Sequence, residues 1–151
     1  MTADAGRSAA DKAEIREILS EYCFRMDDGD YTGVASLFTE DGEWQTNYAA
    51  AKGRQEIADL LDRINPERGA GPFRKHIVAN SVVTVTGDSA RSRASYLVLM
   101  AIDGRPAPIV VGSYDDQLVR DASTASWLIA RRLLVHEIAG SDLALRLPDR
   151  S

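Results

Sequence analysis

The sequence predicts an α+β fold in which N-terminal helices pack inside a strongly curved antiparallel sheet, forming a cone-shaped α+β barrel. Two observations support this prediction. Apolar residues recur at helical spacing over residues 15–64, whereas long β-branched and alternating runs fill residues 76–138. Helices followed by consecutive hairpin-linked strands are typical of α+β proteins. A curved sheet that wraps a long helix leaves a hollow at its open end, where we expect a small-molecule pocket.

The clearest helical signal lies near the N-terminus. Asp11 followed by Glu14 resembles a capping box and predicts the start of this helix, and Gly29 predicts its end. One apolar stripe runs along it at i, i+3, i+4, i+7, i+8 and i+11: Ile15, Ile18, Leu19, Tyr22, Cys23 and Met26.

Two further helices and a short strand are expected before the long strands. Asp30 can cap a short helix that extends through Phe38. A brief strand is expected around Trp44. A third helix follows Gly53, with apolar residues at helical spacing, and Pro66 stops it.

Four long strands complete the predicted sheet. Their sequences are HIVANSVVTVT, SRASYLVLMAI, IVVGSYDDQLV and WLIARRLLVHEI. Residues 87–88, 103–106 and 121–126 separate them and have the composition of hairpin turns. We expect one face of this sheet to pack on the first and third helices.

The length of 151 residues is typical of one domain. We expect a disordered lead over residues 1–10, which lack the apolar region of a secretory signal. A single domain is expected over residues 11–146, and a loose tail over residues 147–151.

Charge and apolar content exclude several classes of partner. The formal net charge is -5 and the isoelectric point is about 5.0, so no basic excess exists to neutralise nucleic acid or an anionic membrane. The longest apolar run, Tyr96 to Ile102, is too short to span a bilayer. The one cysteine, Cys23, cannot form an internal disulfide, which fits a reducing, cytoplasmic location.

Both histidines fall on predicted strands. His76 begins the first long strand and His136 lies near the end of the last. A lone histidine on a strand is more often structural than catalytic. Asp27, however, lies at the margin of the apolar stripe near a helix C-terminus, where the helix dipole disfavours a carboxylate. Either Asp27 belongs to a solvated turn, or it accepts a hydrogen bond from His76 and makes that imidazole a general base.

Other kinds of site receive little support. The chain has no glycine-rich nucleotide-binding motif. Two distant histidines without a cysteine partner do not predict a metal site. Cys23 lies on the apolar face of the first helix, where packing is the simpler role. We expect no cofactor and no metal.

Three segments together carry a family resemblance. They are EIREILSEYCFRMDDGDYTGVASLFTEDGEW, GRQEI and HIVAN. Over Ala13 to Ile138 the chain resembles the SnoaL-like branch of the nuclear-transport-factor-2-like superfamily. That branch includes scytalone dehydratase, bile-acid 7α-dehydratase, hexachlorocyclohexane dehydrochlorinase and the β subunits of ring-hydroxylating dioxygenases.

The resemblance implies four catalytic residues. Asp27 and His76 match the aspartate–histidine dyad of the dehydrochlorinase and the dehydratases. Tyr22 matches a pocket position that polarises the substrate, and Arg132 resembles a last-strand arginine that lines the dehydrochlorinase pocket. Strand alternation would place His136 on the same face as Arg132.

The chain also departs from the dehydratase pattern. Dehydratases carry a second polar group on the strand after the first histidine, whereas Leu97 to Ala101 here offer no proton donor. A copy of the scytalone or bile-acid reaction is therefore not expected. His136 or Tyr114 could supply the missing acid, or could fill the core or lie exposed.

Further side chains are candidates for contact with the substrate. Some would form an apolar pocket wall or plain core. Asn80 would line the pocket or satisfy a strand bend. The apolar candidates are Trp44, Phe73, Tyr96 and Leu99.

Two functions remain open at this stage. One is a cofactor-independent dehydratase, isomerase or cyclase acting on a small apolar or aromatic molecule, of polyketide, terpene or steroid type. The other is a non-catalytic ligand-binding or dioxygenase β-subunit-like scaffold. Apolar side chains on both faces of the strands further predict self-association as a homodimer or homotrimer.

Overall fold

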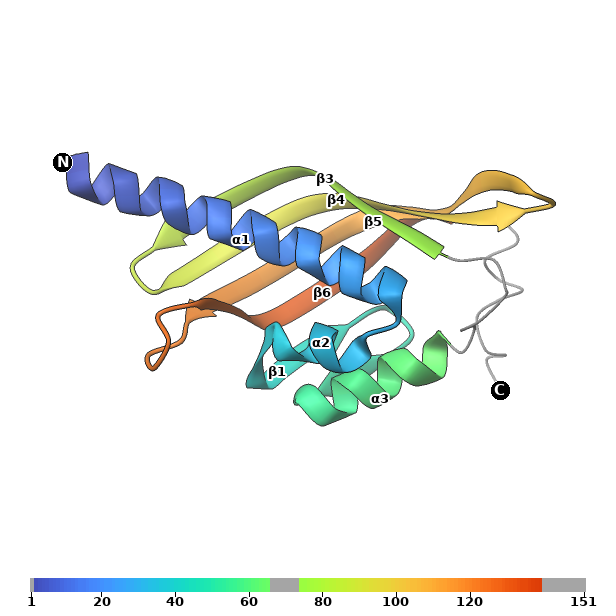
Figure 1. Ribbon diagram of the computed structural model, residues 1–151, viewed down its shortest axis with the longest axis horizontal. Coiled ribbons are helices and arrows are strands. Elements are labelled where there is room, and N and C mark those ends of the chain that lie inside the picture. The colour runs from blue at the N-terminus through green and yellow to red at the C-terminus, as the bar shows by residue number, and fades with distance from the viewer. Residues whose placement is uncertain (1, 66–73, 140–151) are drawn as a thin grey trace.

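The computed structural model describes residues 2–65 and 74–139. Helices precede the long strands, as predicted (Figure 1). The elements in chain order are α1 (Thr2–Asp28), α2 (Tyr31–Ser36), β1 (Phe38–Gln45), β2 (Ala50–Lys52), α3 (Arg54–Ile64), β3 (Arg74–Thr86), β4 (Ser89–Ile102), β5 (Arg105–Arg120) and β6 (Trp127–Ala139).

The strands form one strongly curved sheet that does not close on itself (Figure 1). Their order is β2-β1-β6-β5-β4-β3. All neighbours pair antiparallel except β1 and β6, which are parallel. Helix α1 lies across the sheet beside β3, while α2 and α3 pack together near β1 (Figure 1). This arrangement confirms the predicted fold class.

Helix α1 begins at Thr2, so the predicted start at Asp11 is wrong. Four alanines among residues 3–10 favour continuation of the helix. The Asp11 side chain is buried and does not act as a cap. Its Oδ1 accepts hydrogen bonds from Arg120 Nη2 at 2.7 Å and Trp127 Nε1 at 3.2 Å. Asp11 therefore ties the middle of α1 to β5 and β6.

The end of α1 is as predicted. Gly29 has φ of +69°, and two backbone bonds close a Schellman motif: Gly29 N to Met26 O at 3.2 Å and Asp30 N to Arg25 O at 2.9 Å. The Asp30 side chain then caps α2 by accepting from Gly33 N at 2.9 Å. The turn after α1 is thereby set by backbone geometry.

The structure differs from the prediction at two points near β1. Phe38 begins β1, whereas its spacing predicted the end of α2. The three-residue strand β2 was not predicted, because it is too short to show an alternating pattern. The predicted hairpin turns between the four long strands are confirmed. Pro66 and residues 147–151 lie outside the described residues.

An ion pair lies inside the apolar core. Arg132 on β6 and Asp116 on β5 are both 0% exposed and face each other across the two strands. Arg132 Nε and Nη2 donate to the two Asp116 carboxylate oxygens at 2.8 and 2.7 Å. The guanidinium carbon lies 4.0 Å from the Tyr22 ring and 4.2 Å from the Tyr114 ring. Burial lowers the pKa of Arg132, but the Asp116 carboxylate outweighs it, and the net shift is upward.

Replacement of Asp116 by Asn should destabilise the protein strongly. The variant keeps the side-chain shape but leaves the Arg132 charge buried without a counter-ion, a change that costs about 3–5 kcal/mol. Urea denaturation of the variant would measure the loss. Asp115→Asn is the matched control, because Asp115 is exposed on the same strand. Equal unfolding free energies for the two variants would contradict this account of the core.

Candidate functional site

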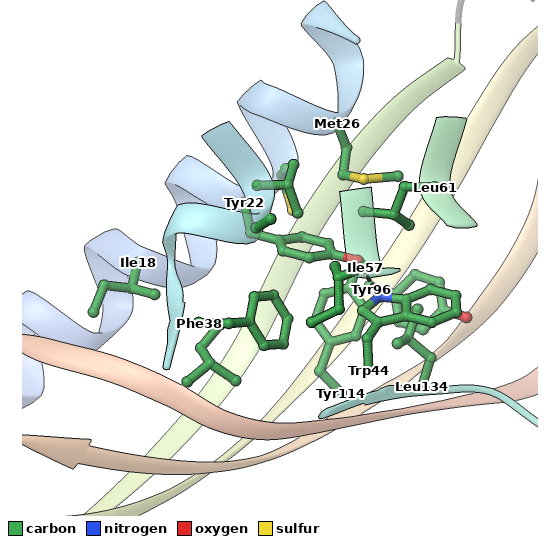
Figure 2. Close-up of a cluster of buried hydrophobic side chains, with 14 of the residues drawn as sticks. Ile18, Tyr22, Met26, Phe38, Trp44, Ile57, Leu61, Tyr96, Tyr114 and Leu134 are labelled. Carbon is green, nitrogen blue, oxygen red and sulfur yellow. Dashed lines mark hydrogen bonds between the residues drawn. The ribbon is translucent and has the colours of Figure 1, made fainter. Parts of the chain in front are cut away.

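A cavity of about 80 Å³ lies between the helices and the concave face of the sheet. Helices α1 and α3 and strands β1, β3, β4, β5 and β6 all contribute to its wall. Its deeper wall is built from buried aromatic and aliphatic side chains, several of which converge in Figure 2. Those on the wall include Tyr22, Trp44, Leu61, Tyr96, Tyr114 and Leu134.

His76 lines the cavity and Asp27 lies behind it. Their contact spans 49 residues of sequence, with His76 Nδ1 2.8 Å from Asp27 Oδ1. The same oxygen accepts the His76 backbone N–H at 2.9 Å. The side chains are 11% and 9% exposed, respectively. The predicted contact is therefore present, although Asp27 supports His76 from outside the cavity wall.

Lys75 provides a second partner for the carboxylate. Its Nζ lies 3.0 Å from Asp27 Oδ2 and 5.1 Å from the centre of the Phe24 ring. Burial raises the pKa of Asp27, but hydrogen bonds from His76 and Lys75 outweigh burial and hold it below its ordinary value. Asp27 is thus ionised at neutral pH.

An ionised carboxylate only accepts hydrogen bonds. A neutral His76 that bonds to Asp27 must therefore carry its proton on Nδ1. Its Nε2 then keeps the lone pair. The backbone N–H and the ring Nδ1 of His76 both bond to Asp27 Oδ1, and together these two bonds fix the plane of the imidazole ring.

Tyr22 and Trp44 form a polar pair in the wall. Trp44 Nε1 donates to the Tyr22 hydroxyl at 2.8 Å (Figure 2). Since that oxygen already accepts, its own proton is free to be donated. Burial raises the pKa of Tyr22 to about 12, so the hydroxyl stays protonated.

Two further tyrosines stack beside Tyr22. The Tyr96 and Tyr114 rings lie 4.4 Å apart and are 3° from parallel, and Tyr22 meets Tyr114 edge-on at 5.7 Å. Burial raises the pKa of both Tyr96 and Tyr114. Within residues 2–65 and 74–139, the buried Tyr96 hydroxyl has no hydrogen-bond partner. It is a second donor available at the cavity wall.

His136 also lines the cavity. Its ring lies 5.4 Å from the Tyr48 ring and 6.1 Å from the Tyr96 ring. Burial lowers the pKa of His136, which favours the neutral imidazole. It shares the inward face of β6 with Arg132, as strand alternation predicted.

Two predicted site residues, Arg132 and Leu99, do not line the cavity. Arg132 is not at the cavity surface: it lies beneath Tyr22 and Tyr114 with its charge offset by Asp116. Leu99 faces away from the cavity, because strand alternation puts it opposite its buried neighbours on β4.

Asn80 and Phe73 complete the set of predicted residues. Asn80 is exposed, with φ of +51°, at the irregularity between Ala79 and Val82 in the β3–β4 pairing. Of the two roles predicted for Asn80, lining the pocket or satisfying a strand bend, the structure supports the strand bend. Phe73 lies outside the described residues.

Sequence reasoning missed three polar residues of the cavity wall: Tyr48, Asn65 and Arg74. Tyr48 and Asn65 lie in connections, where no periodicity marks an inward position. Arg74 could have been found, since it lies two residues before His76 and therefore on the same face of β3.

The described part of the chain offers neither a cluster of metal ligands nor a membrane-spanning helix. No cluster there of three or more His, Cys, Asp or Glu residues could hold a metal ion. No helix there is both long enough and apolar enough to cross a membrane.

Similar structures share this architecture. An NTF2-like protein with a cystatin-like fold from Novosphingobium aromaticivorans is 27% identical, with 98% of this chain and 96% of that chain covered and a TM-score of 0.79. A Catenulispora acidiphila protein in complex with S-DNPA is 24% identical (85% and 95% covered, TM-score 0.76). The β subunit of a putative aromatic-ring-hydroxylating dioxygenase from N. aromaticivorans is 22% identical (93% and 97% covered, TM-score 0.73). The last two likenesses concern the fold alone.

The family of this domain is given by the match of its sequence to a family model. No curated protein matches the chain. The SnoaL-like domain model, in contrast, matches residues 7–133, which is most of the chain and includes most of α1 and the first five strands. The chain belongs to the SnoaL-like family.

Proposed function

We propose that this protein is a cofactor-independent lyase, isomerase or cyclase that removes a proton from a carbon atom of a small, mostly apolar molecule. The observation that most directly supports this proposal is the 2.8 Å contact between His76 Nδ1 and Asp27 at the wall of an aromatic cavity. His76 would be the general base, and Asp27 would hold its tautomer and stabilise the imidazolium that forms.

The proton would move from the substrate carbon to His76 Nε2. The electron pair left on carbon delocalises into an adjacent carbonyl, giving an enolate whose oxygen needs a hydrogen-bond donor. Tyr22 suits that role, because its hydroxyl accepts from Trp44 and keeps its own proton to donate. Elimination, isomerisation or ring closure can each follow from the enolate.

The charge of Arg132 would contribute indirectly. It lies against the face of Tyr22, so its positive potential favours a Tyr22 hydroxyl that donates strongly. We therefore propose Arg132 as a residue that positions Tyr22, in place of the direct substrate contact that the sequence predicted.

A ligand-binding or scaffold protein without catalysis is the second candidate. It is favoured by the apolar Val98 and Met100, which occupy the inward face of β4 beside Tyr96. The structural likeness to a dioxygenase β subunit is compatible with it. On this alternative, Asp27 and His76 would form a structural pair.

Self-association is also proposed, with a second copy of this chain as the partner. One row of apolar residues crosses four paired strands on the face away from the cavity: Ile77, Leu97, Val111 and Ile138. Ile77 is 41% exposed and Ile138 is 67% exposed. Such a row on an exposed sheet face is typical of an interface.

Replacing either His76 or Asp27 should strongly reduce proton transfer. His76→Asn should reduce deuterium exchange at the α-carbons of aromatic ketones, with 2-tetralone as the first probe, by about 100-fold or more, since general bases contribute 10²–10⁴-fold. Asp27→Asn should reduce it strongly as well, because the tautomer is no longer fixed. NMR in D₂O measures the exchange.

Asp28→Asn is the matched control for the exchange assay. Asp28 is exposed and adjacent to Asp27 on α1, so this variant should retain the wild-type rate. Wild-type rates in both His76→Asn and Asp27→Asn would exclude the mechanism and leave the ligand-binding alternative.

The stabilising effect of Asp27 should depend on pH. Its pKa is lower in the folded protein than in the unfolded chain, so its contribution is present above the unfolded value and is lost as pH falls through the folded value. Below the range in which histidine titrates, the difference in unfolding free energy between wild type and Asp27→Asn should therefore shrink from about pH 5 to about pH 2. Urea denaturation at several pH values measures it. A difference that stays constant or grows between about pH 5 and about pH 2 would contradict the pairing.

Self-association has its own test. Light scattering at micromolar concentration should report a dimer or trimer for the wild type. Ile77→Glu puts a charge at the β3 end of the apolar row and should shift the protein toward monomer. A monomeric wild-type protein would refute the proposed interface.

A further inference from the structure

Arg74 places a positive charge at the cavity close to His76. The two residues are separated by one position on β3, so their side chains leave the same face of the strand about 6.6 Å apart. Both line the cavity. Any molecule that reaches His76 therefore also lies near a guanidinium.

The partner of Arg74 is neutral. Its Nη1 donates to the Asn65 carboxamide oxygen. Asn65 is itself held in place at the end of α3, since its Nδ2 and its backbone N–H both donate to Leu61 O, at 2.9 and 3.1 Å. Asn65 thus orients Arg74 without offsetting its charge.

Among residues 2–65 and 74–139, no carboxylate forms a salt bridge with Arg74. Its Nε is buried and, within the same residues, has no acceptor. A buried donor without a partner costs about 1–3 kcal/mol, more when the group is charged. Such a cost at a cavity wall is offset when a ligand supplies the acceptor.

Three other charged or titratable groups at or behind the cavity wall do not balance the charge of Arg74. Asp27, the carboxylate behind His76, is already bonded to His76 and Lys75. His136 across the cavity is neutral through burial. Tyr48, also on the wall, remains protonated because burial raises its pKa despite the opposing charge of Arg74.

We propose that the cavity takes small aromatic or alicyclic acids, whose carboxylate is bound by Arg74 while the carbon to be deprotonated lies at His76. This rests on the proposed function and adds the substrate class to it. A guanidinium binds a carboxylate through two parallel N–H···O bonds, which also fixes the orientation of the ligand. The spacing on β3 favours substrates in which a ring-sized spacer separates the carboxylate from the acidic carbon.

The test compares an acid with its neutral amide. Isothermal titration of 4-oxocyclohexanecarboxylate and 4-oxocyclohexanecarboxamide, in which a single ring separates the carboxyl group from the acidic carbons, should show the acid binding about tenfold or more tightly, since a hydrogen bond to a charged group is stronger than one to a neutral group. Arg74→Gln should remove the preference. Arg74→Lys keeps the positive charge and should retain part of the preference for the acid. This second variant keeps the inference testable if Arg74→Gln does not fold. Arg63→Gln is the matched control, because Arg63 is exposed on α3 and does not line the cavity.

Three results would overturn the inference: equal affinity for acid and amide, no binding of the acid, or a preference that survives Arg74→Gln. This binding test can succeed or fail independently of the proton-exchange test of the proposed function. His76→Asn should preserve the preference for the acid, because binding does not require the base. Acid-selective binding without any proton exchange would refute catalysis and leave this inference standing.

Discussion

The buried ion pair between Arg132 and Asp116 is the interaction on which the cavity depends. It links β5 to β6 at the centre of the core. Its guanidinium supports the rings of Tyr22 and Tyr114, which form the floor of the cavity. Removing either charge would leave the other buried without a partner, which is strongly destabilising. The pair therefore favours the arrangement in which Tyr22 packs on the Arg132 guanidinium.

A second constraint fixes the contact between Asp27 and His76. Asp27 lies in the last turn of α1, and the Schellman motif at Gly29 ends the helix directly after it. The carboxylate consequently meets the first residues of β3, where it binds the backbone and ring of His76 and the ammonium of Lys75. Backbone geometry at Gly29 therefore helps to place the Asp27 carboxylate behind His76.

Periodicity and turn residues were enough to predict the helices, the four long strands and the fold class, because each is encoded locally. Buried polar contacts between distant segments were not predictable in this way. Asp11 looked like a helix cap, yet it binds Arg120 and Trp127. Arg132 was expected in the pocket but is paired with Asp116. The contact of Asp27 with His76 was proposed mainly from family resemblance, since spacing alone favoured a solvated acidic turn.

The most direct test of the central claim is the tautomer of His76. Nitrogen-15 NMR of the neutral imidazole distinguishes a protonated Nδ1 from a protonated Nε2. If Asp27 orients His76 as a general base, wild-type protein should carry the proton on Nδ1, and Asp27→Asn should lose that preference. A wild-type His76 protonated on Nε2, or a tautomer unchanged in Asp27→Asn, would contradict the account.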